Sequence, residues 1–103
     1  AVDHELGYVY CSDEQVGIRK YYVDPRRETT ELALFGTEGF ADDHEGISIC
    51  STGAGTGYLI VSDQGRHAFR FYSREGSEGN PHDHRFLGSV QVPARSSDGS
   101  ELT

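Results

Sequence analysis

The chain has 103 residues, of which 35% are hydrophobic and 13 are glycine, so it has the length of one domain but little material for a large closed core. Its 17 acidic residues outnumber 9 basic ones, and the formal net charge of -8 disfavours nucleic acid as a partner. No stretch approaches the roughly 20 apolar residues of a membrane span, and the residues at the start of the sequence lack the basic and apolar regions of a signal peptide. We therefore expect a soluble chain with no membrane partner.

Short apolar runs between turn residues predict strands along the whole chain. They are expected near residues 7–12, 17–23, 31–35, 46–51, 57–62, 67–73 and 86–92. Segments rich in Gly, Ser, Asp and Pro are expected to be loops, at residues 24–30, 73–85 and 93–100. No long stretch has the periodicity of an amphipathic helix, so the expected fold class is all-β.

The chain contains an internal repeat. Residues 7–14 (GYVYCSDE) align without a gap on residues 57–64 (GYLIVSDQ), at an offset of 50 residues. At the same offset residues 18–22 align on residues 68–72, so a basic residue followed by two aromatic residues recurs. A period of about 40 to 50 residues made of short strands is typical of β-propeller blades.

The repeat predicts a β-propeller fragment of about two four-stranded antiparallel blades. Residues 1–40 would form an incomplete blade that lacks its innermost strand, residues 41–95 a complete blade, and residues 96–103 the start of the next one. A propeller has typically 4 to 8 blades, so two blades leave strand faces uncovered. Other blades of a parent chain, or further copies of this one, would have to cover them.

Two cysteines lie in the predicted strands. Cys11 and Cys50 have no metal-ligand spacing, and in apolar strand-like runs the expected state is a buried free thiol. Whether the two pair in a disulfide stays open at this point.

Acidic and amide side chains follow equivalent strands of the two repeats. Asp13 and Glu14 end one strand, and Asp63 and Gln64 end its counterpart. Because propellers carry their sites on loops at one end of the channel, we expect these equivalent positions to carry oxygen ligands.

A third acidic group, residues 42–46 (DDHEG), precedes the strand at 46–51. On an extended segment Asp43 and Glu45 should point the same way, where they repel each other unless a cation binds them. Together with Glu14 and Gln64 they supply the oxygen ligands that calcium prefers, whereas zinc prefers nitrogen or sulfur. Ordinary polar loop residues remain an alternative explanation.

These stretches resemble the β-propeller phytases. The resembling segments are residues 3–10 (DHELGYVY), 12–14 (SDE), 43–47 (DHEGI), 57–65 (GYLIVSDQG) and 97–101 (SDGSE), in the family's order. The resemblance implies a six-bladed propeller whose acidic channel mouth binds several calcium ions. It also implies removal of phosphate from myo-inositol hexakisphosphate (phytate), which makes the parent protein a phosphomonoester hydrolase of the 3-phytase type and this chain a fragment of it.

The resemblance also implies roles for individual residues. Glu14, Asp43, Glu45 and Gln64 correspond to calcium ligands and Asp98 to a further one; Glu14, Glu45 and Gln64 are assigned to the catalytic centre. A calcium-activated water would attack phosphorus, without a covalent phospho-enzyme. The basic residues that grip substrate phosphates are expected on other blades. A secreted or periplasmic location is implied by the family alone.

Other conspicuous residues have structural explanations. Residues 82–84 (HDH) are expected to form a solvated turn, and residues 3–5 (DHE) a surface turn. Arg19, Lys20 and Arg70 lie in predicted strands and are expected to be surface or edge charges. The aromatic strand residues are expected to form the core: Tyr8, Tyr10, Tyr21, Tyr22, Tyr58, Phe69, Phe71 and Tyr72.

Two further functions stay open because propellers host many activities. One is a non-catalytic propeller module, braced by calcium, that binds a protein or carbohydrate partner. The other is a two-blade scaffold whose copies assemble into a ring.

Overall fold

The computed structural model describes residues 1–13, 16–37, 44–63 and 67–91, the side chains of residues 44 and 45 excepted. Every regular element in these ranges is a strand, and no helix long and apolar enough to cross a membrane occurs in them. The strands are β1 (Val2–Asp3), β2 (Tyr8–Asp13), β3 (Gly17–Tyr22), β4 (Ala33–Phe35), β5 (His44–Gly53), β6 (Thr56–Asp63), β7 (Ala68–Ser73) and β8 (Phe86–Gln91).

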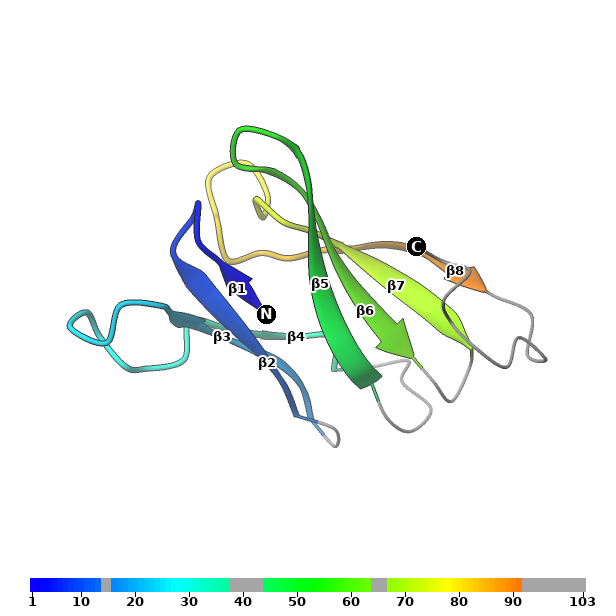
Figure 1. Ribbon diagram of the computed structural model, residues 1–103, viewed down its shortest axis with the longest axis horizontal. Coiled ribbons are helices and arrows are strands. Elements are labelled where there is room, and N and C mark those ends of the chain that lie inside the picture. The colour runs from blue at the N-terminus through cyan, green and yellow to red at the C-terminus, as the bar shows by residue number, and fades with distance from the viewer. Residues whose placement is uncertain (14–15, 38–43, 64–66, 92–103) are drawn as a thin grey trace.

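The strands form two four-stranded antiparallel sheets (Figure 1). Their orders are β1-β2-β3-β4 and β5-β6-β7-β8, so each sheet is a simple meander. This confirms the predicted all-β class and the two blade-like sheets. The short strand β1 was not predicted; its two residues pair with β2 at the edge where the innermost strand of a blade would lie.

The pairing register corrects the alignment of the two repeats. Cys11 pairs with Arg19 in the first sheet, and Val61, 50 positions after Cys11, pairs with Arg70 in the second. Arg19 is therefore equivalent to Arg70 at an offset of 51, because the connection between β6 and β7 is one residue longer than that between β2 and β3. The gapless alignment of residues 18–22 on 68–72 was wrong by one residue.

The core lies between the two sheets. Tyr10 and Ile18 of the first sheet and Leu59, Val61 and Tyr72 of the second are each at most 2% exposed. Side chains alternate between the two faces of a strand, so every second residue of β2 and β6 points into this layer. The predicted aromatic core is thus confirmed at two tyrosines.

The strand residues that alternate with these buried ones lie on the outer faces of the sheets. Tyr58 is 40% exposed although it was expected in the core. Cys11 and Cys50 are free thiols and both are exposed, which contradicts the expected burial. The physical reason is the same alternation, which places their neighbours Tyr10 and Ile49 on the inner faces.

A buried ion pair fastens the two sheets together. Arg74, which follows β7, donates from Nε to Asp3 Oδ2 at 2.8 Å and from Nη2 to Asp3 Oδ1 at 2.9 Å. It also reaches Glu5 Oε1 at 2.9 Å and the carbonyl oxygen of Thr56 at 2.9 Å. The side chains of Arg74 and Asp3 are 4% and 1% exposed. The sequence predicted a surface turn at residues 3–5; the turn is present, but Asp3 at its start is buried, because its partner Arg74 lies 71 positions away.

We predict that Arg74→Met destabilises the protein by about 3–5 kcal/mol, because it leaves the Asp3 carboxylate buried without a counter-ion. Urea unfolding of the variant and the wild type measures the change. Arg26→Met is the matched control: the Arg26 side chain is 89% exposed beside Asp24, and such surface pairs contribute little to stability. Equal effects of the two substitutions would contradict the role given to Arg74.

Candidate functional site

Three of the segments that carry candidate ligands adjoin strand ends, and these ends lie on the same side of the two sheets. Asp13, the last residue of β2, pairs with Gly17 of β3. Asp63, the last residue of β6, pairs with both His44 of β5 and Ala68 of β7. Figure 1 shows these strand ends at the lower edge of both sheets. The topology therefore brings the chain positions that adjoin the predicted ligands to the same end of the fold.

Most of the predicted ligands fall outside the described residues, so their roles stay predictions. These are Glu14, Asp43, Gln64 and Asp98; of Glu45 the structure gives only the backbone, as the second residue of β5. In the ranges that are described, no group of three or more His, Cys, Asp or Glu side chains could hold a metal ion.

A β-bulge interrupts β5 beside Glu45. His44 pairs with Asp63, and Ile47 pairs with Val61. Between these two pairs β5 therefore has one residue more than β6. Within the bulge the backbone N–H of Gly46 donates to Ser62 Oγ at 3.1 Å. Bulges redirect side chains and are frequent beside functional sites. The bulge interrupts the regular alternation between His44 and Ile47; the common direction of Asp43 and Glu45 stays a prediction, because Asp43 lies outside the described residues.

The two equivalent aspartates have different surroundings. Asp13 Oδ2 accepts hydrogen bonds at 3.2 Å from Arg19, whose Nη1 also lies 2.6 Å from Glu31 Oε1. Hydrogen bonds to Glu31 and Asp13 raise the pKa of Arg19, so it stays a cation held by two carboxylates. Asp63 faces the first sheet and is 1% exposed. Arg19, on the inner strand β3, is partly exposed as the sequence predicted, and its two carboxylate partners were not predicted.

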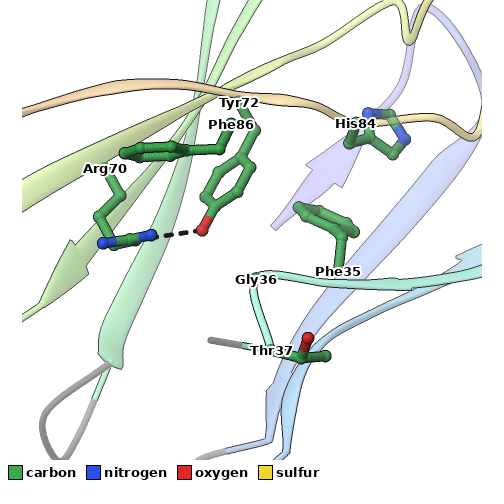
Figure 2. Close-up of a pocket in the computed structure, with 7 residues that line it drawn as sticks. All are labelled: Phe35, Gly36, Thr37, Arg70, Tyr72, His84 and Phe86. Carbon is green, nitrogen blue, oxygen red and sulfur yellow. Dashed lines mark hydrogen bonds between the residues drawn. The ribbon is translucent and has the colours of Figure 1, made fainter. Parts of the chain in front are cut away.

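A cavity of about 470 Å³ opens between the sheets (Figure 2). It is lined by Phe35, Gly36, Thr37, Arg70, Tyr72, His84 and Phe86. Arg70 lies along its wall, where Nε donates to the hydroxyl of Tyr72 at 3.2 Å and the guanidinium stacks 4.3 Å from the ring centre of Phe86. Arg70 is therefore half-buried against aromatic rings rather than a simple surface charge.

Lys20 is fully buried, which corrects the expected surface position. Its Nζ lies 2.9 Å from the carbonyl oxygen of Pro81, 2.9 Å from His82 Nδ1 and 3.7 Å from the ring centre of Tyr8. Burial lowers the pKa of Lys20 to about 8. The ammonium group is enclosed between the first sheet and the loop that follows β7, and it is not available to bind a substrate phosphate.

The segment HDH at residues 82–84 is not the solvated turn that the sequence predicted. His84 is 5% exposed, and its Nδ1 lies 2.6 Å from the carbonyl oxygen of Ser73. His82 packs edge-on against Tyr8, with ring centres 5.8 Å apart. Asp83 is partly exposed and pairs with Arg85. No local signal could reveal this, because Lys20 and His82 are 62 positions apart.

Comparison with known proteins decides the family. Residues 1–99 match the family model described as Phytase. The chain belongs to the phytase family. It is 30% identical over 76 residues to a 3-phytase of Bacillus subtilis (strain 168), in a match that covers 72% of this chain and 20% of that protein. Comparison with solved structures gave no significant match. This phytase-family chain therefore spans about a fifth of the length of the curated relative it matches.

Gly17 closes the hairpin that follows Asp13 in this phytase-family chain. It is buried with φ +154°, and an added Cβ would lie 2.7 Å from the carbonyl oxygen of Phe35 and 3.1 Å from Thr37 Cγ2. Only a residue without a side chain lets β4 approach this closely.

We expect Gly17→Ala to destabilise the protein by about 1–3 kcal/mol, because β4 or the hairpin must shift to admit the methyl group. Gly88→Ala is a matched control, since Gly88 has φ +151° but no atom within 4 Å of an added Cβ. Thermal unfolding distinguishes backbone strain, which both share, from the clash at Gly17. The explanation fails if Gly88→Ala is as harmful as Gly17→Ala.

Proposed function

We propose that this chain is a piece of a calcium-dependent phytase, a phosphomonoester hydrolase that removes phosphate from phytate. The observation that carries the proposal is the match to the phytase family over residues 1–99. Its two meander sheets have the strand order of propeller blades and so agree with a fragment of a larger propeller.

The uncovered face of the second sheet supports the proposal that the parent protein has further blades. Tyr58, Leu87 and Val90 are 40–54% exposed there, and a groove of about 540 Å³ runs between them. By register, Tyr58 and Phe71 are equivalent to Tyr8 and Lys20, which face the second sheet from the first. The face thus repeats a surface that already binds a sheet, so its proposed occupant is the next blade of a six-bladed ring.

The negative charges of the chain and of phytate support the proposal that metal ions lie between protein and substrate. The chain has a formal charge of -8, and phytate is strongly anionic, so the two repel unless cations reverse the local potential. Carboxylate and amide oxygens suit calcium. When bound, calcium would neutralise substrate phosphates and activate a water. The candidate ligands are Glu14, Asp43, Glu45, Gln64 and Asp98, of which Glu14, Glu45 and Gln64 are the catalytic candidates.

Three basic residues in the described strands support the assignment of phosphate binding to other blades. Arg19 is paired with two carboxylates, Lys20 is enclosed, and Arg70 lies against two aromatic rings. None of the three is placed to receive a substrate phosphate as a free cation. We therefore assign the basic residues that bind substrate phosphates to other blades. A secreted or periplasmic location is proposed from the family.

The test is phosphate release from phytate by the full-length parent, with calcium and with a chelator. We expect the chelator to abolish release, and Glu45→Gln to weaken calcium affinity and lower kcat/KM by about 100-fold, because an oxygen ligand loses its charge. Glu78→Gln, in an exposed stretch of the loop before β8, should change neither.

The same assay gives a pH profile. Carboxylates must be ionised to hold calcium, so activity should fall in acid and be highest at neutral to alkaline pH. Full activity in chelator, or a peak near about pH 3, where most carboxylic acids are protonated, would contradict the proposal.

A further inference from the structure

The loop between β7 and β8, residues 74–85, fastens the second sheet onto the first at two places. Near its start Arg74 binds Asp3 of β1 through two hydrogen bonds. Near its end the carbonyl oxygen of Pro81 and the ring of His82 contact Lys20 of β3. The loop therefore connects the two sheets at two points. The second point, where Pro81 and His82 contact Lys20, contains groups that can gain or lose a proton.

The contacts of Lys20 fix the protonation state of His82. An ammonium group can only donate hydrogen bonds, so both atoms 2.9 Å from Nζ must be acceptors. The carbonyl oxygen of Pro81 is one of them. His82 Nδ1 is the other and therefore carries no proton while the loop is docked. Protonated Nδ1 would place a second cation against Lys20.

His84 must also be neutral in the docked loop. Its Nδ1 donates to the carbonyl oxygen of Ser73 at 2.6 Å, so the neutral ring has its lone pair on Nε2. Nε2 is buried and has no hydrogen-bond partner among the described residues. The ring stands edge-on to Tyr10 at 5.6 Å and lies 4.9 Å from Phe35, as Figure 2 shows for Phe35. A proton on Nε2 would be a buried charge among aromatic rings.

We propose that His82 and His84 form a pH-sensitive latch, which holds the two sheets together while both imidazoles are neutral and releases the β7–β8 loop when they are protonated. The latch goes beyond the proposed function and does not depend on it. It is a second cause of acid sensitivity, separate from protonation of calcium ligands.

The direction of the pH effect follows from the released state, in which a histidine has its ordinary pKa of about 6.5. In the docked state burial, followed by the charge of Lys20, lowers the pKa of His82, and burial lowers the pKa of His84 to about 4. The released loop thus binds protons more strongly than the docked loop. Docking is fully stable above about pH 6.5 and weakens as the pH falls toward the lowered values.

Lys20 does not reverse this behaviour on the alkaline side. Its pKa is lowered by burial to about 8, so between about 8 and the ordinary value near 10.5 the docked state has already lost a proton that the released state still binds. A rise in pH through this range therefore favours docking. The latch opens in acid only.

Other charged or titratable groups surround the latch, and their effects are smaller than burial. Glu28 raises the pKa of His82 and Asp83 raises that of His84, but burial is the larger cause at both rings. Asp3 favours the charged form of Lys20 and is itself bound by Arg74. Three tyrosines also border the latch or its neighbours, Tyr8, Tyr10 and Tyr22.

The test is hydrogen exchange, measured by mass spectrometry on the full-length parent at about pH 7.5 and pH 5, on either side of the ordinary histidine pKa. Rates are corrected for the intrinsic effect of pH. In the wild type we expect peptides from residues 74–85 to lose protection about tenfold more than peptides from β6, since each unit of pKa shift corresponds to a factor of ten.

The double variant H82N/H84N should keep its protection at the lower pH. Asparagine supplies an oxygen acceptor or an amide donor near the position of Nδ1 and does not titrate in this range. H67N is the matched control: His67 is exposed with φ 52°, which asparagine tolerates, and this variant should respond to acid like the wild type.

The proposal is overturned if the wild-type loop keeps its protection at the lower pH, or if H82N/H84N loses it as the wild type does. Repeating the exchange with calcium and with chelator separates the latch from the metal site, because a loss that follows calcium and ignores both histidines also overturns it. Should the double variant fail to fold, NMR titration of the wild-type histidine Cε1 protons decides: pKa values at or above about 6.5 for both rings exclude the latch.

Discussion

Each sheet of this protein has two faces, and among the described residues only one face of each is covered by the other sheet; the rest of the structure depends on that constraint. The buried faces meet in a small layer formed by Tyr10, Ile18, Leu59, Val61 and Tyr72. Because the strands alternate, the same geometry leaves the opposite faces open, with large apolar residues exposed on β6 and β8. A blade-like sheet therefore requires neighbours on both sides, which agrees with a chain that spans about a fifth of its curated relative.

The contact between the sheets combines an apolar centre with polar attachments at one loop. Arg74 and Lys20 both lie in the interface, and each finds its partner across it. These attachments set how the sheets are oriented, and so bring the strand ends at Asp13 and Asp63 to one edge. The proposed acidic site would need that orientation, because its candidate ligands come from segments that are far apart in the sequence.

The all-β class and every described strand except the short β1 could be predicted from alternation and turn residues, which are local signals. The register of the second pairing could not, since a single additional residue between β6 and β7 shifts the equivalence of Arg19 and Arg70. Burial of Asp3, Lys20 and His84 was missed for a related reason: charged or polar residues in turns, and in a strand in the case of Lys20, are expected to be solvated unless a partner from a distant part of the chain encloses them. For the candidate site, motifs suggested the ligands, but nothing local indicated the bulge in β5.

The most direct test of the account is calcium titration calorimetry on this chain, paired with a phosphate-release assay on the same sample. The account predicts saturable calcium binding without turnover, because these two blades would hold oxygen ligands while the cations that grip phytate belong to other blades. Absence of any calcium binding by the folded chain would contradict it and would favour a propeller without a catalytic metal site.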